Sequence, residues 1–563
     1  MRSHGKQKRP QPQRSPCPCC GLPDTDSTCI LNATPVERVP NSQVTREEVI
    51  LAKQVVEEGQ ARIERLEEAI ELLMAQHEIF HSVVADHMSF LSPINALPDD
   101  ILWQIFLELR PDCGPWQVAV VCRRWRAAAI SCSELWADLE YDYYGMGPEV
   151  GASQLAILLE RSGSRPLRLS IRLPQHDARF DGPAHQPIVE LIAANASRIR
   201  AISCEGSTNI FAEEVLDLLS LDTLIINNQG EIDEIGWLAS DLPHRTPLLR
   251  RLELRHTELG ETSSLSVPWS SLVELELCDI NTNAAAILHI LSQTSSLAKL
   301  VIAPPTWVQD ELFIYSLHEV EVPRLRHLSV AFTVNDANSV SFHENTDDMY
   351  DDPTKQLPKL LQHLRAPRLE EMKLEDVTGE DLHAVCSFLE GSIPPLQVLH
   401  VKKLDLVTMA SWATFIPLLA AVPTLEQFLL SFVNKPSEHV AGLETILAAM
   451  SLPIGIPREE DSPLLCPLIT TISFHALMLP FSALQSVIES RVCAPAAILK
   501  TLHLSDIQWH LSREDLEACE DHPDGEIIMH RWLEGMKERG LEYTKMKVTP
   551  RYLRCGERAR GGK

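Results

Sequence analysis

A short pattern, apolar-x-x-apolar-x-apolar, recurs eleven times between residues 199 and 504 and constrains the fold more than any other feature. Its copies are Ile199/Ile202/Cys204, Leu221/Leu224/Ile226, Leu249/Leu252/Leu254, Leu272/Leu275/Leu277, Leu297/Leu300/Ile302, Leu325/Leu328/Val330, Leu369/Met372/Leu374, Leu396/Leu399/Val401, Leu425/Phe428/Leu430, Ile469/Ile472/Phe474 and Leu499/Leu502/Leu504. Successive copies begin 22 to 30 residues apart, except for two steps of 44 residues that fit insertions. A repeat of this length is one supersecondary unit that buries its apolar side only by stacking on its neighbours.

The period of the pattern is that of leucine-rich repeats, with one strand and one helix in each repeat. Amphipathic runs at 212–219, 284–291, 381–389 and 484–488 supply helices between the strands. We therefore expect an irregular leucine-rich-repeat-like α/β horseshoe over residues 150–545. The alternative is a mixed α/β domain whose strands happen to share a pattern.

One departure from that repeat concerns the third position after the last apolar residue of each strand, where an Asn or Cys usually bonds the backbone of the loop. Other residues stand at this position: Thr257, Ile280, Val377, Leu404, Val433 and Ile507. The stack should therefore be irregular.

Side chains alternate along a strand, so the polar positions of these strands should share one concave face. The candidate target-binding residues on it are Arg251, Glu253, Arg255, Glu274, Glu276, Lys299, Glu371, Lys373, His400 and Lys402. A surface that reads phosphates would carry one sign of charge, whereas this mosaic of both signs suits a protein partner. The alternative is that these residues are simply solvated.

Charge and hydropathy narrow the class of protein. The 563 residues include 78 acidic and 50 basic ones, a net charge of −28, which repels nucleic-acid backbones. No run of 18 apolar residues predicts a membrane span, and the first fifteen residues contain no apolar core of a secretory signal. We expect no nucleic-acid or membrane partner, reduced cysteines, and a location in the cytoplasm, the nucleus or both.

The two ends of the chain look like tails. Residues 1–43 are rich in Pro, Ser, Gln and Arg, and residues 546–563 are basic, so both are expected to be disordered. The first tail contains Cys17, Cys19, Cys20 and Cys29. Zinc is usually bound by two separated pairs of ligands, whereas three of these cysteines crowd into four positions; we predict no metal site. Polar insertions at 335–358 and 451–466 are expected to be solvated loops.

Residues 44–90 carry a heptad pattern that predicts a long amphipathic helix. The apolar positions alternate by three and four residues: Val49, Ala52, Val56, Gly59, Ile63, Leu66, Ile70, Leu73, His77, Phe80, Val84 and His87. Five heptads are long enough for a coiled coil, which would make a homodimer through 49–87. A single helix packed against the rest of the chain is the alternative.

Residues 91–140 predict a small all-α module. Pro98, Asp99 and Asp100 form a helix start, since proline suits the first turn and carboxylates complement the positive end of the helix dipole. Apolar residues follow at helical spacing up to Leu109, and Arg110-Pro111 should end that helix. A second helix is expected to run through Val118, Val121, Cys122, Trp125 and Ala128, and Leu135-Trp136 adds a further apolar anchor.

The runs PINALPDDILWQIFLEL, VAVVCRRWRAAA and SELWADL resemble the F-box in order and approximate spacing. Two departures are Asp100, where the family often has Glu, and the insert Pro-Asp-Cys-Gly-Pro at 111–115. The preceding heptads and the segment LAILLERSGSRPLRLSIRL at 155–173 look like an architecture common in basidiomycete fungi.

The resemblance implies binding: F-box segments dock by an apolar helical face onto the Skp-type adaptor of a cullin–RING (SCF-type) ubiquitin ligase. The residues of the motif carried over by the match are Leu97, Pro98, Ile101, Ile105, Phe106, Val121 and Trp125. Among them Leu97, Pro98 and Ile101 are the first candidates for contact, and Trp125 should be shared between core and interface. The alternative is a generic helical hairpin that caps the repeats.

Several common catalytic motifs are absent, which favours binding over catalysis. The sequence contains no GxxxxGK[ST], no GxGxxG after a strand and no GxSxG. We therefore expect a substrate-recruiting adaptor that is not an enzyme and binds no cofactor, with a protein target held by residues 150–545. The alternative function is a repeat scaffold for protein–protein interaction with no link to a ligase.

Overall fold

The computed structural model describes residues 44–110, 113–142, 148–172, 186–206, 216–227, 242–257, 267–303, 306–307, 318–332, 356–404, 409–432, 440–451, 465–475, 478–492, 498–505, 507–510 and 525–546. The chain forms two compact units, Met1–Leu102 and Trp103–Lys563. The predicted tail at 1–43 with its cysteine cluster, the predicted tail at 546–563 apart from Met546, and nearly all of both polar insertions lie outside the described residues.

The first unit contains one long helix, α1 (Arg46–Leu91), which spans 46 residues and confirms the helix predicted over 44–90. Its start is fixed by a capping box. The Glu48 backbone N–H donates to Thr45 Oγ1 at 3.3 Å, and the Thr45 backbone N–H donates back to Glu48 Oε2 at 2.8 Å. A short 3₁₀ turn, η2 (Pro93–Ala96), follows. In the described part of the chain, no helix is apolar over a length that would span a bilayer.

A cluster of short helices comes next along the chain, and the boundary between the two units falls within the first of them. The elements are α2 (Asp99–Glu108), α3 (Pro115–Val121), α4 (Arg123–Ser131) and η3 (Ser133–Trp136). The single helix predicted through Val118 and Ala128 is wrong, because Cys122 is extended (φ −156°) and separates α3 from α4. The Cys122 thiol caps α4 by accepting the Trp125 backbone N–H.

A 14-stranded sheet organises the rest of the second unit. Its strands are β1 (Asp138–Asp142), β2 (Leu167–Arg172), β3 (Ile199–Glu205), β4 (Thr223–Asn227), β5 (Arg251–Arg255), β6 (Glu274–Cys278), β8 (Lys299–Ala303), β11 (His327–Ala331), β13 (Glu371–Glu375), β14 (Val398–Leu404), β15 (Gln427–Phe432), β16 (Thr471–His475), β18 (Thr501–Ser505) and β20 (Glu542–Met546). They lie side by side in chain order, and every neighbouring pair is parallel. Three two-stranded parallel ribbons accompany them: β7 (Asn281–Thr282) with β9 (Thr306–Trp307), β10 (Val320–Glu321) with β12 (Leu364–Arg365), and β17 (Met478–Pro480) with β19 (Gln508–His510).

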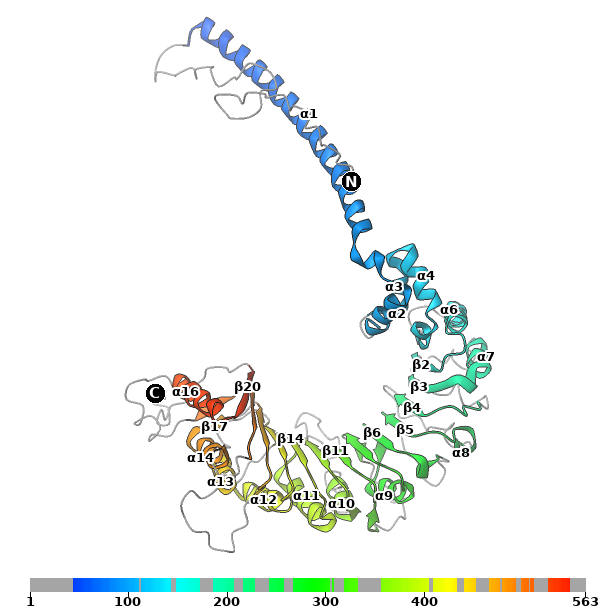
Figure 1. Cartoon of the computed structure of the whole chain (residues 1–563), viewed down its shortest axis with the longest axis vertical. Helices are drawn as coiled ribbons and strands as arrows, with labels where there is room; N and C mark the ends of the chain where they lie inside the picture. The colour runs from blue at the N-terminus through cyan, green and yellow to red at the C-terminus, as the bar shows by residue number, and fades with distance from the viewer. Residues whose placement is uncertain are drawn as a thin grey trace, which may run out of the picture. The chain divides into compact units, whose positions relative to one another are not determined.

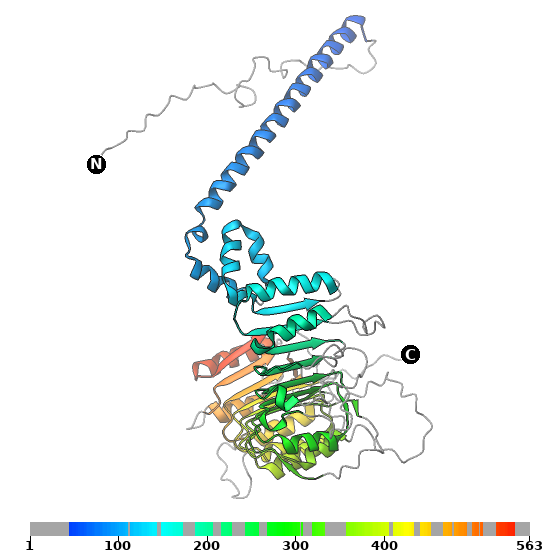
Figure 2. The ribbon, with the colours of Figure 1, turned by 90° about the vertical axis from the view of Figure 1, so that its right-hand side faces the viewer.

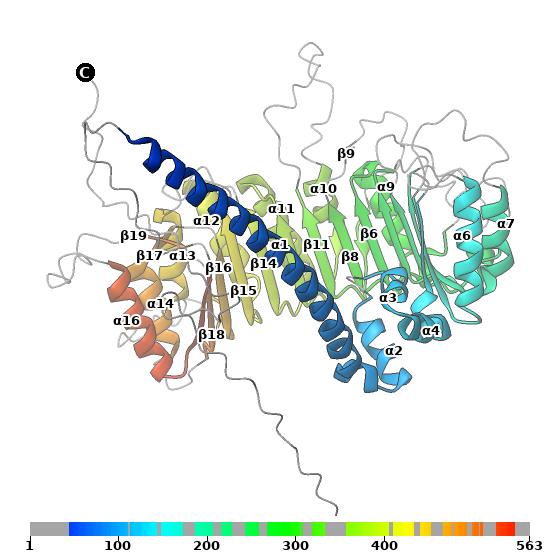
Figure 3. The ribbon, with the colours of Figure 1, turned by 90° about the horizontal axis from the view of Figure 1, so that it is seen from above.

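Helices connect most of the strands and lie along one face of the sheet (Figure 1). They are α6 (Pro148–Arg161), α7 (Gln186–Asn195), α8 (Leu242–Arg245), α9 (Ala284–Gln293), α10 (Gln356–His363), α11 (Gly379–Ser392), α12 (Met409–Ala420), α13 (Val440–Met450), α14 (Phe481–Val492) and α16 (Gly525–Glu538), with the 3₁₀ turns η5 (Ala196–Arg198) and η9 (Trp269–Ser271). Figures 2 and 3 show the same succession of strands from two further sides. The arrangement is a strand-rich α/β region around a parallel sheet, as the repeated pattern predicts.

The core lies between the sheet and its helices, and the repeated triads build it. In each of the eleven copies the last two apolar residues lie in a strand of the main sheet and are buried. The position that lacks Asn is also apolar and buried in four copies, at Ile280, Val377, Leu404 and Ile507, so packing replaces a ladder of side-chain amides there.

A left-handed residue directly after the strand recurs in several repeats and explains how those side chains turn back into the core. The residues with positive φ are Gly206, His256, Asp279 and Asp376, which follow their strands, and Lys403, which lies near the end of β14; each stands two positions after the last apolar residue of its triad. Glycine and aspartate tolerate this region of φ and ψ, which explains Gly206, Asp279 and Asp376. His256 and Lys403 adopt the same conformation at the equivalent position.

Arginines close the helix ends of two repeats. Arg198 donates to the carbonyls of Leu159 and Gly163 at the end of α6, and Arg491 donates to Met450, Leu465 and Cys466 after α13. The last carbonyls of a helix have no partner inside it, so each guanidinium satisfies one of them, at Leu159 or Met450, together with carbonyls of the chain outside the helix.

The predicted helices at 284–291, 381–389 and 484–488 are confirmed as α9, α11 and α14. The helix expected at 212–219 is not formed in its described part, residues 216–219. Leu216 and Leu218 are buried there without helical backbone, so burial rather than helical periodicity explains the spacing of their apolar side chains.

Candidate partner-binding surfaces

Aromatic side chains hold the short helices of the second unit together. The Trp103 indole N–H donates to the Ala128 carbonyl at 2.9 Å, which ties α2 to α4. The rings of Phe106 and Trp125 pack with centroids 5.1 Å apart. A half-buried indole with a satisfied N–H and a tilted ring pair fix the angle between these two helices.

A second aromatic cluster joins the helices to the start of the sheet. Trp116 and Trp136 meet edge to face with ring centroids 5.1 Å apart. The Arg161 guanidinium of α6 lies 4.4 Å from the centroid of the Trp136 ring and 4.7 Å from that of Trp116. Arg110 forms an ion pair with Asp138 at the start of β1. The module is therefore continuous with the sheet of the same unit.

The residues predicted for the docking face differ in exposure. In the first unit Leu97 is half-buried, whereas Pro98 and Ile101 are exposed, Ile101 by 37%. In the second unit Ile105 and Trp125 are half-buried and Val121 is 60% exposed. Phe106 is fully buried and belongs to the core of the module, so it is removed from the candidate contacts. Ile101 and Ile105 follow one helical turn apart in α2, on the same side of that helix.

Further exposed apolar residues of this region were not predicted as contacts. Val120 is 70% exposed beside Val121, and Trp116 and Ile130 are 38% and 43% exposed. The helical spacing of Val118 and Val121 defines the predicted apolar side of this helix, and Val120 does not lie on that side. The signal that would have revealed it is the run of three valines around one alanine, which offers more apolar surface than a short helix buries.

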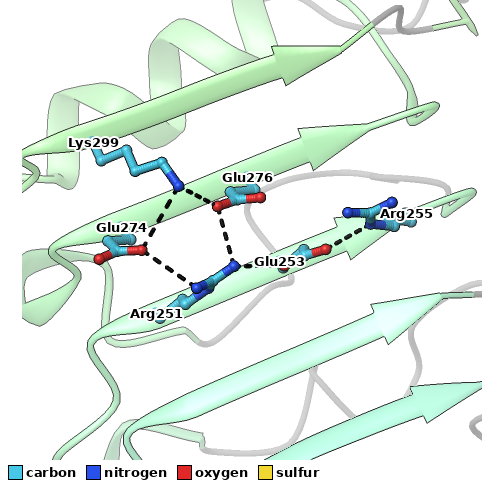
Figure 4. Close-up of polar contacts among 6 residues, drawn as sticks. All are labelled: Arg251, Glu253, Arg255, Glu274, Glu276 and Lys299. Carbon is cyan, nitrogen blue, oxygen red and sulfur yellow. Dashed lines mark hydrogen bonds and ion pairs between the residues drawn. The ribbon is translucent and has the colours of Figure 1, made fainter. Parts of the chain in front are cut away.

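The polar face of the sheet carries a closed network of six charged residues on three adjacent strands, β5, β6 and β8 (Figure 4). Arg251 contacts three carboxylates: Glu253 at 3.0 Å, Glu276 at 3.2 Å and Glu274 at 3.7 Å. Lys299 Nζ lies 2.6 Å from Glu276, and Arg255 Nε lies 2.6 Å from Glu253. Three cations and three carboxylates balance, so the network presents a mosaic without net charge.

The exposure predicted for two of these residues is wrong. Glu253 and Glu276 are only 4% and 8% exposed, because the longer side chains of Arg251, Arg255 and Lys299 cover them. Hydrogen bonding to Glu253 raises the pKa of Arg255. The two glutamates therefore order the cations, and the outer atoms of the cations are what a target could contact.

A second group lies on β11 and β13. Glu371 accepts from His327 Nδ1 at 2.9 Å and lies 2.6 Å from Lys373 Nζ. Burial opposes the charge of Glu371, but the hydrogen bonds from Lys373 and His327 outweigh it and lower its pKa. Register places Lys373 beside His400 on β14. Burial, then the nearby Lys373, lowers the pKa of His400.

Two hollows adjoin these groups within the second unit. One of about 420 Å³ lies over β6 to β13 and is lined by Lys299, Val301, Ser329 and Lys373, among others. Another of about 1070 Å³ lies over β1 to β5 and includes Arg110, Trp116 and Arg200 in its wall. Both lie on the polar face of the sheet, where an extended segment of a protein target could be held.

The run HEIFH in α1 matches the HExxH pattern, and the rings of His77 and His81 have centroids 6.0 Å apart. Among the described residues, no three His, Cys, Asp or Glu side chains gather as metal ligands do. Burial raises the pKa of the Cys278 and Cys386 thiols to about 11, so these thiols stay protonated at neutral pH.

The comparisons with known proteins agree with the helical module. A family model described as F-box-like matches residues 94–141, the segment that contains α2, α3, α4 and η3. No curated protein sequence matches the chain significantly. The chain therefore contains an F-box-like domain, a domain type that acts as a protein-interaction adaptor and typically binds Skp-type partners.

Proposed function

We propose that this chain recruits a protein target to a cullin–RING (SCF-type) ubiquitin ligase. The F-box-like domain docks on the Skp-type adaptor, which is held by the cullin, and the repeat region binds the target. The chain supplies position, and other subunits supply the thioester chemistry. The observation that carries the proposal is the exposed apolar surface of a segment that matches the F-box-like family, with Pro98, Ile101 and Val121 open to solvent.

The exposure pattern of the domain supports docking more than capping of the repeats. Phe106 and Trp136 are fully buried and hold the module, while Val120, Val121 and Ile101 remain outside. A helical hairpin that merely closed a core would bury such side chains, since each buried aliphatic side chain contributes about 1.5–3 kcal/mol. A few aliphatic anchors on a pre-formed module are the usual source of affinity at an interface.

We propose further that the repeat region curves into a leucine-rich-repeat-like horseshoe. Neighbouring strands lie about 4.8 Å apart, whereas packed helices need about 8–10 Å between their axes. A parallel sheet in chain order with helices on one face must therefore bend away from the helices. The repeated left-handed turns at His256, Asp279, Asp376 and Lys403 support a regular unit.

The concave face of this horseshoe is the proposed target site. The charged network of β5, β6 and β8 fixes cations whose counter-charges are already buried, so a partner meets ordered donors without having to order them. The two hollows adjoin this network and Lys373. Opposite charges on the target would then select it and set its register.

Co-purification of the two recombinant proteins tests the ligase link. The chain and a Skp-type adaptor are co-expressed, with Leu97→Asp plus Ile101→Asp as the disrupted variant. The double substitution places charge on the apolar contact surface, which costs several kcal/mol when that surface is buried. The proposal expects a stable complex with the wild type and loss of the adaptor with the variant. It is abandoned if neither protein retains the adaptor, or if both retain it equally.

The second candidate function is a non-enzymatic scaffold in which the repeat region binds proteins without a ligase. The closed ion-pair network on the sheet favours protein binding in either case. Retention of a target by a chain that does not bind the adaptor would select the scaffold. Both functions fit a location in the cytoplasm or the nucleus, and neither assigns the chain an enzymatic activity or a cofactor.

A further inference from the structure

Within the first unit, as far as the structure describes it, the long helix α1 leaves its apolar seam uncovered. Along this seam Val56, Ile63, Leu66, Ile70 and Leu73 are each 53% to 63% exposed. A 46-residue helix with such a stripe is unstable alone in water, because helix stability in proteins comes chiefly from packing of the apolar face. The stripe therefore needs an occupant, and its sequence specifies which one.

We infer that the occupant is α1 of a second copy of this chain, aligned parallel and in register as a two-stranded coiled coil. The heptad places the β-branched residues Val49, Val56, Ile63, Ile70 and Val84 at the first core position, a. Leucines occupy the other core position, d, at the centre of the seam: Leu66 and Leu73. β-Branched residues at a with leucine at d favour two parallel strands over three or four.

The flanking charges support the same alignment. In a parallel dimer each g residue faces the e residue five positions later on the partner helix. The six pairs are Glu48–Lys53, Val55–Gln60, Arg62–Glu67, Ala69–Met74, Gln76–His81 and Val83–Met88. Two pairs are of opposite charge, two are apolar and none is of like charge, so a second copy is the complementary partner for this helix.

Reversing one helix removes that complementarity. With Val49 opposite His87, the antiparallel alignment sets Glu48 against Val83, Arg62 against Ala69, Lys53 against Met88 and Glu67 against Met74. All four charges then face apolar side chains. His77 adds a further constraint, since it occupies an a position and meets its own copy only in the parallel alignment. The other histidine of the seam, His87 at a d position, likewise meets its own copy only in the parallel alignment, and polar residues in the seam are a known means of fixing register.

A dimer of this kind goes beyond the proposed ligase role and does not depend on it. It would place two F-box-like domains and two repeat regions in one assembly. Once one segment of a target with two binding segments is bound, the second segment would bind the other copy as an intramolecular step. The gain in affinity is then set by the effective concentration of that second segment.

Sedimentation and light scattering of the purified full-length chain, with no adaptor present, test the inference. The wild type is expected at twice its 63.1 kDa mass at micromolar concentration. Arg62→Glu, and Glu67→Arg separately, should weaken dimerisation by about tenfold, since each converts two attractive pairs into repulsive ones. The double exchange Arg62→Glu plus Glu67→Arg should restore it, although Arg62→Glu still faces Glu58 on its own helix. Glu68→Arg, on the outer side of the helix, is the matched control and should change nothing.

Disulfide trapping tests the orientation. Ala52→Cys lies at a d position, and Ala61→Cys lies on the outer side of the helix. Mild oxidation should link the two introduced thiols across the dimer in the first variant and not in the second, as identified by mass spectrometry of the cross-linked peptide. A monomeric wild type, a trimer, a double exchange that fails to restore dimers, or equal trapping in both variants would overturn the inference. None of these results depends on whether the chain binds a Skp-type adaptor.

Discussion

The buried guanidinium of Arg491 offers a sharp test of how the repeats are held together. Its side chain is 1% exposed and donates to three carbonyls. Nε and Nη2 reach Met450 at 3.1 and 2.8 Å, Nη2 reaches Leu465 at 2.8 Å, and Nη1 reaches Cys466 at 2.9 Å. Burial lowers the pKa of this arginine, so the carbonyls compensate a charge that has lost its water.

Arg491→Met retains much of the apolar stem and removes every one of these hydrogen bonds. Leaving a buried acceptor unsatisfied costs about 1–3 kcal/mol, so three carbonyls give about 3–5 kcal/mol after partial relaxation. The loss should be local to α13 and α14, because each repeat contacts mainly its neighbours. Arg491→Lys should recover little of this stability. A single ammonium group cannot reach all three carbonyls, which the planar guanidinium contacts through three different nitrogens.

Hydrogen exchange followed by mass spectrometry measures this opening without assuming that a repeat array unfolds in two states. For peptides covering α13 and α14, a loss of about 3 kcal/mol speeds exchange by about a hundredfold. Arg531→Met is the matched control, because Arg531 is exposed on α16, and exchange in those peptides should stay as in the wild type. Equal protection of α13 and α14 in Arg491→Met and in the wild type would refute the argument that carbonyl capping by arginine stabilises these repeats.

Three further predictions concern other parts of the second unit. His400 has a lowered pKa, caused by burial and then by Lys373, so the unfolded state takes up its proton first as pH falls below about 6.5; stability then declines until the folded-state pKa is passed. His400→Gln should therefore show a smaller drop in urea midpoint between pH 7.5 and 5.5 than the wild type, and an equal drop would contradict the assignment. Burial raises the pKa of the Cys386 thiol to about 11 and that of Cys466 to about 12, so iodoacetamide at pH 8 should label exposed Cys122 and spare both, as read by peptide mass spectrometry. Trp103→Phe removes the hydrogen bond to Ala128 and should lower the free energy of local opening of α2 and α4 by about 0.5–1.5 kcal/mol, measured by hydrogen exchange of peptides from these helices; unchanged exchange would show that the bond contributes nothing.

The sequence was most informative where one local pattern decides the structure. The eleven apolar triads predicted strands, because alternation with period two and burial on one side leave few other conformations. The heptads predicted α1 for the same reason. Strand β1 follows the triad with the buried residues Trp136, Leu139 and Tyr141, ahead of the eleven copies, and was missed. Strands β2 and β20 depart from the triad, so their pairing with neighbours in the sheet was not visible from spacing.

Elsewhere the structure depends on contacts between distant residues. The chain breaks its helix at Cys122, where a thiol caps α4, although the apolar spacing continues through this point. Glu253 and Glu276 occupy positions predicted to be exposed, yet arginines of the same strand cover Glu253, and cations of the two neighbouring strands cover Glu276. The separation of Phe106, in the core, from Val120 and Val121, outside, likewise depends on which faces of three short helices meet.

The affinity of the purified chain for a Skp-type adaptor, measured by calorimetry, tests the central claim most directly. Ile101→Asp and Val121→Asp each place a charge on the exposed apolar surface of the F-box-like segment, and each should weaken binding at least a hundredfold if that residue is buried on docking. Val150→Asp makes the same change at an exposed valine outside the matched segment and should bind as the wild type does. Tight binding by the wild type, lost in the first two variants and retained in the third, is the result that the account predicts. No binding by the wild type, or equal binding by all four proteins, would contradict it.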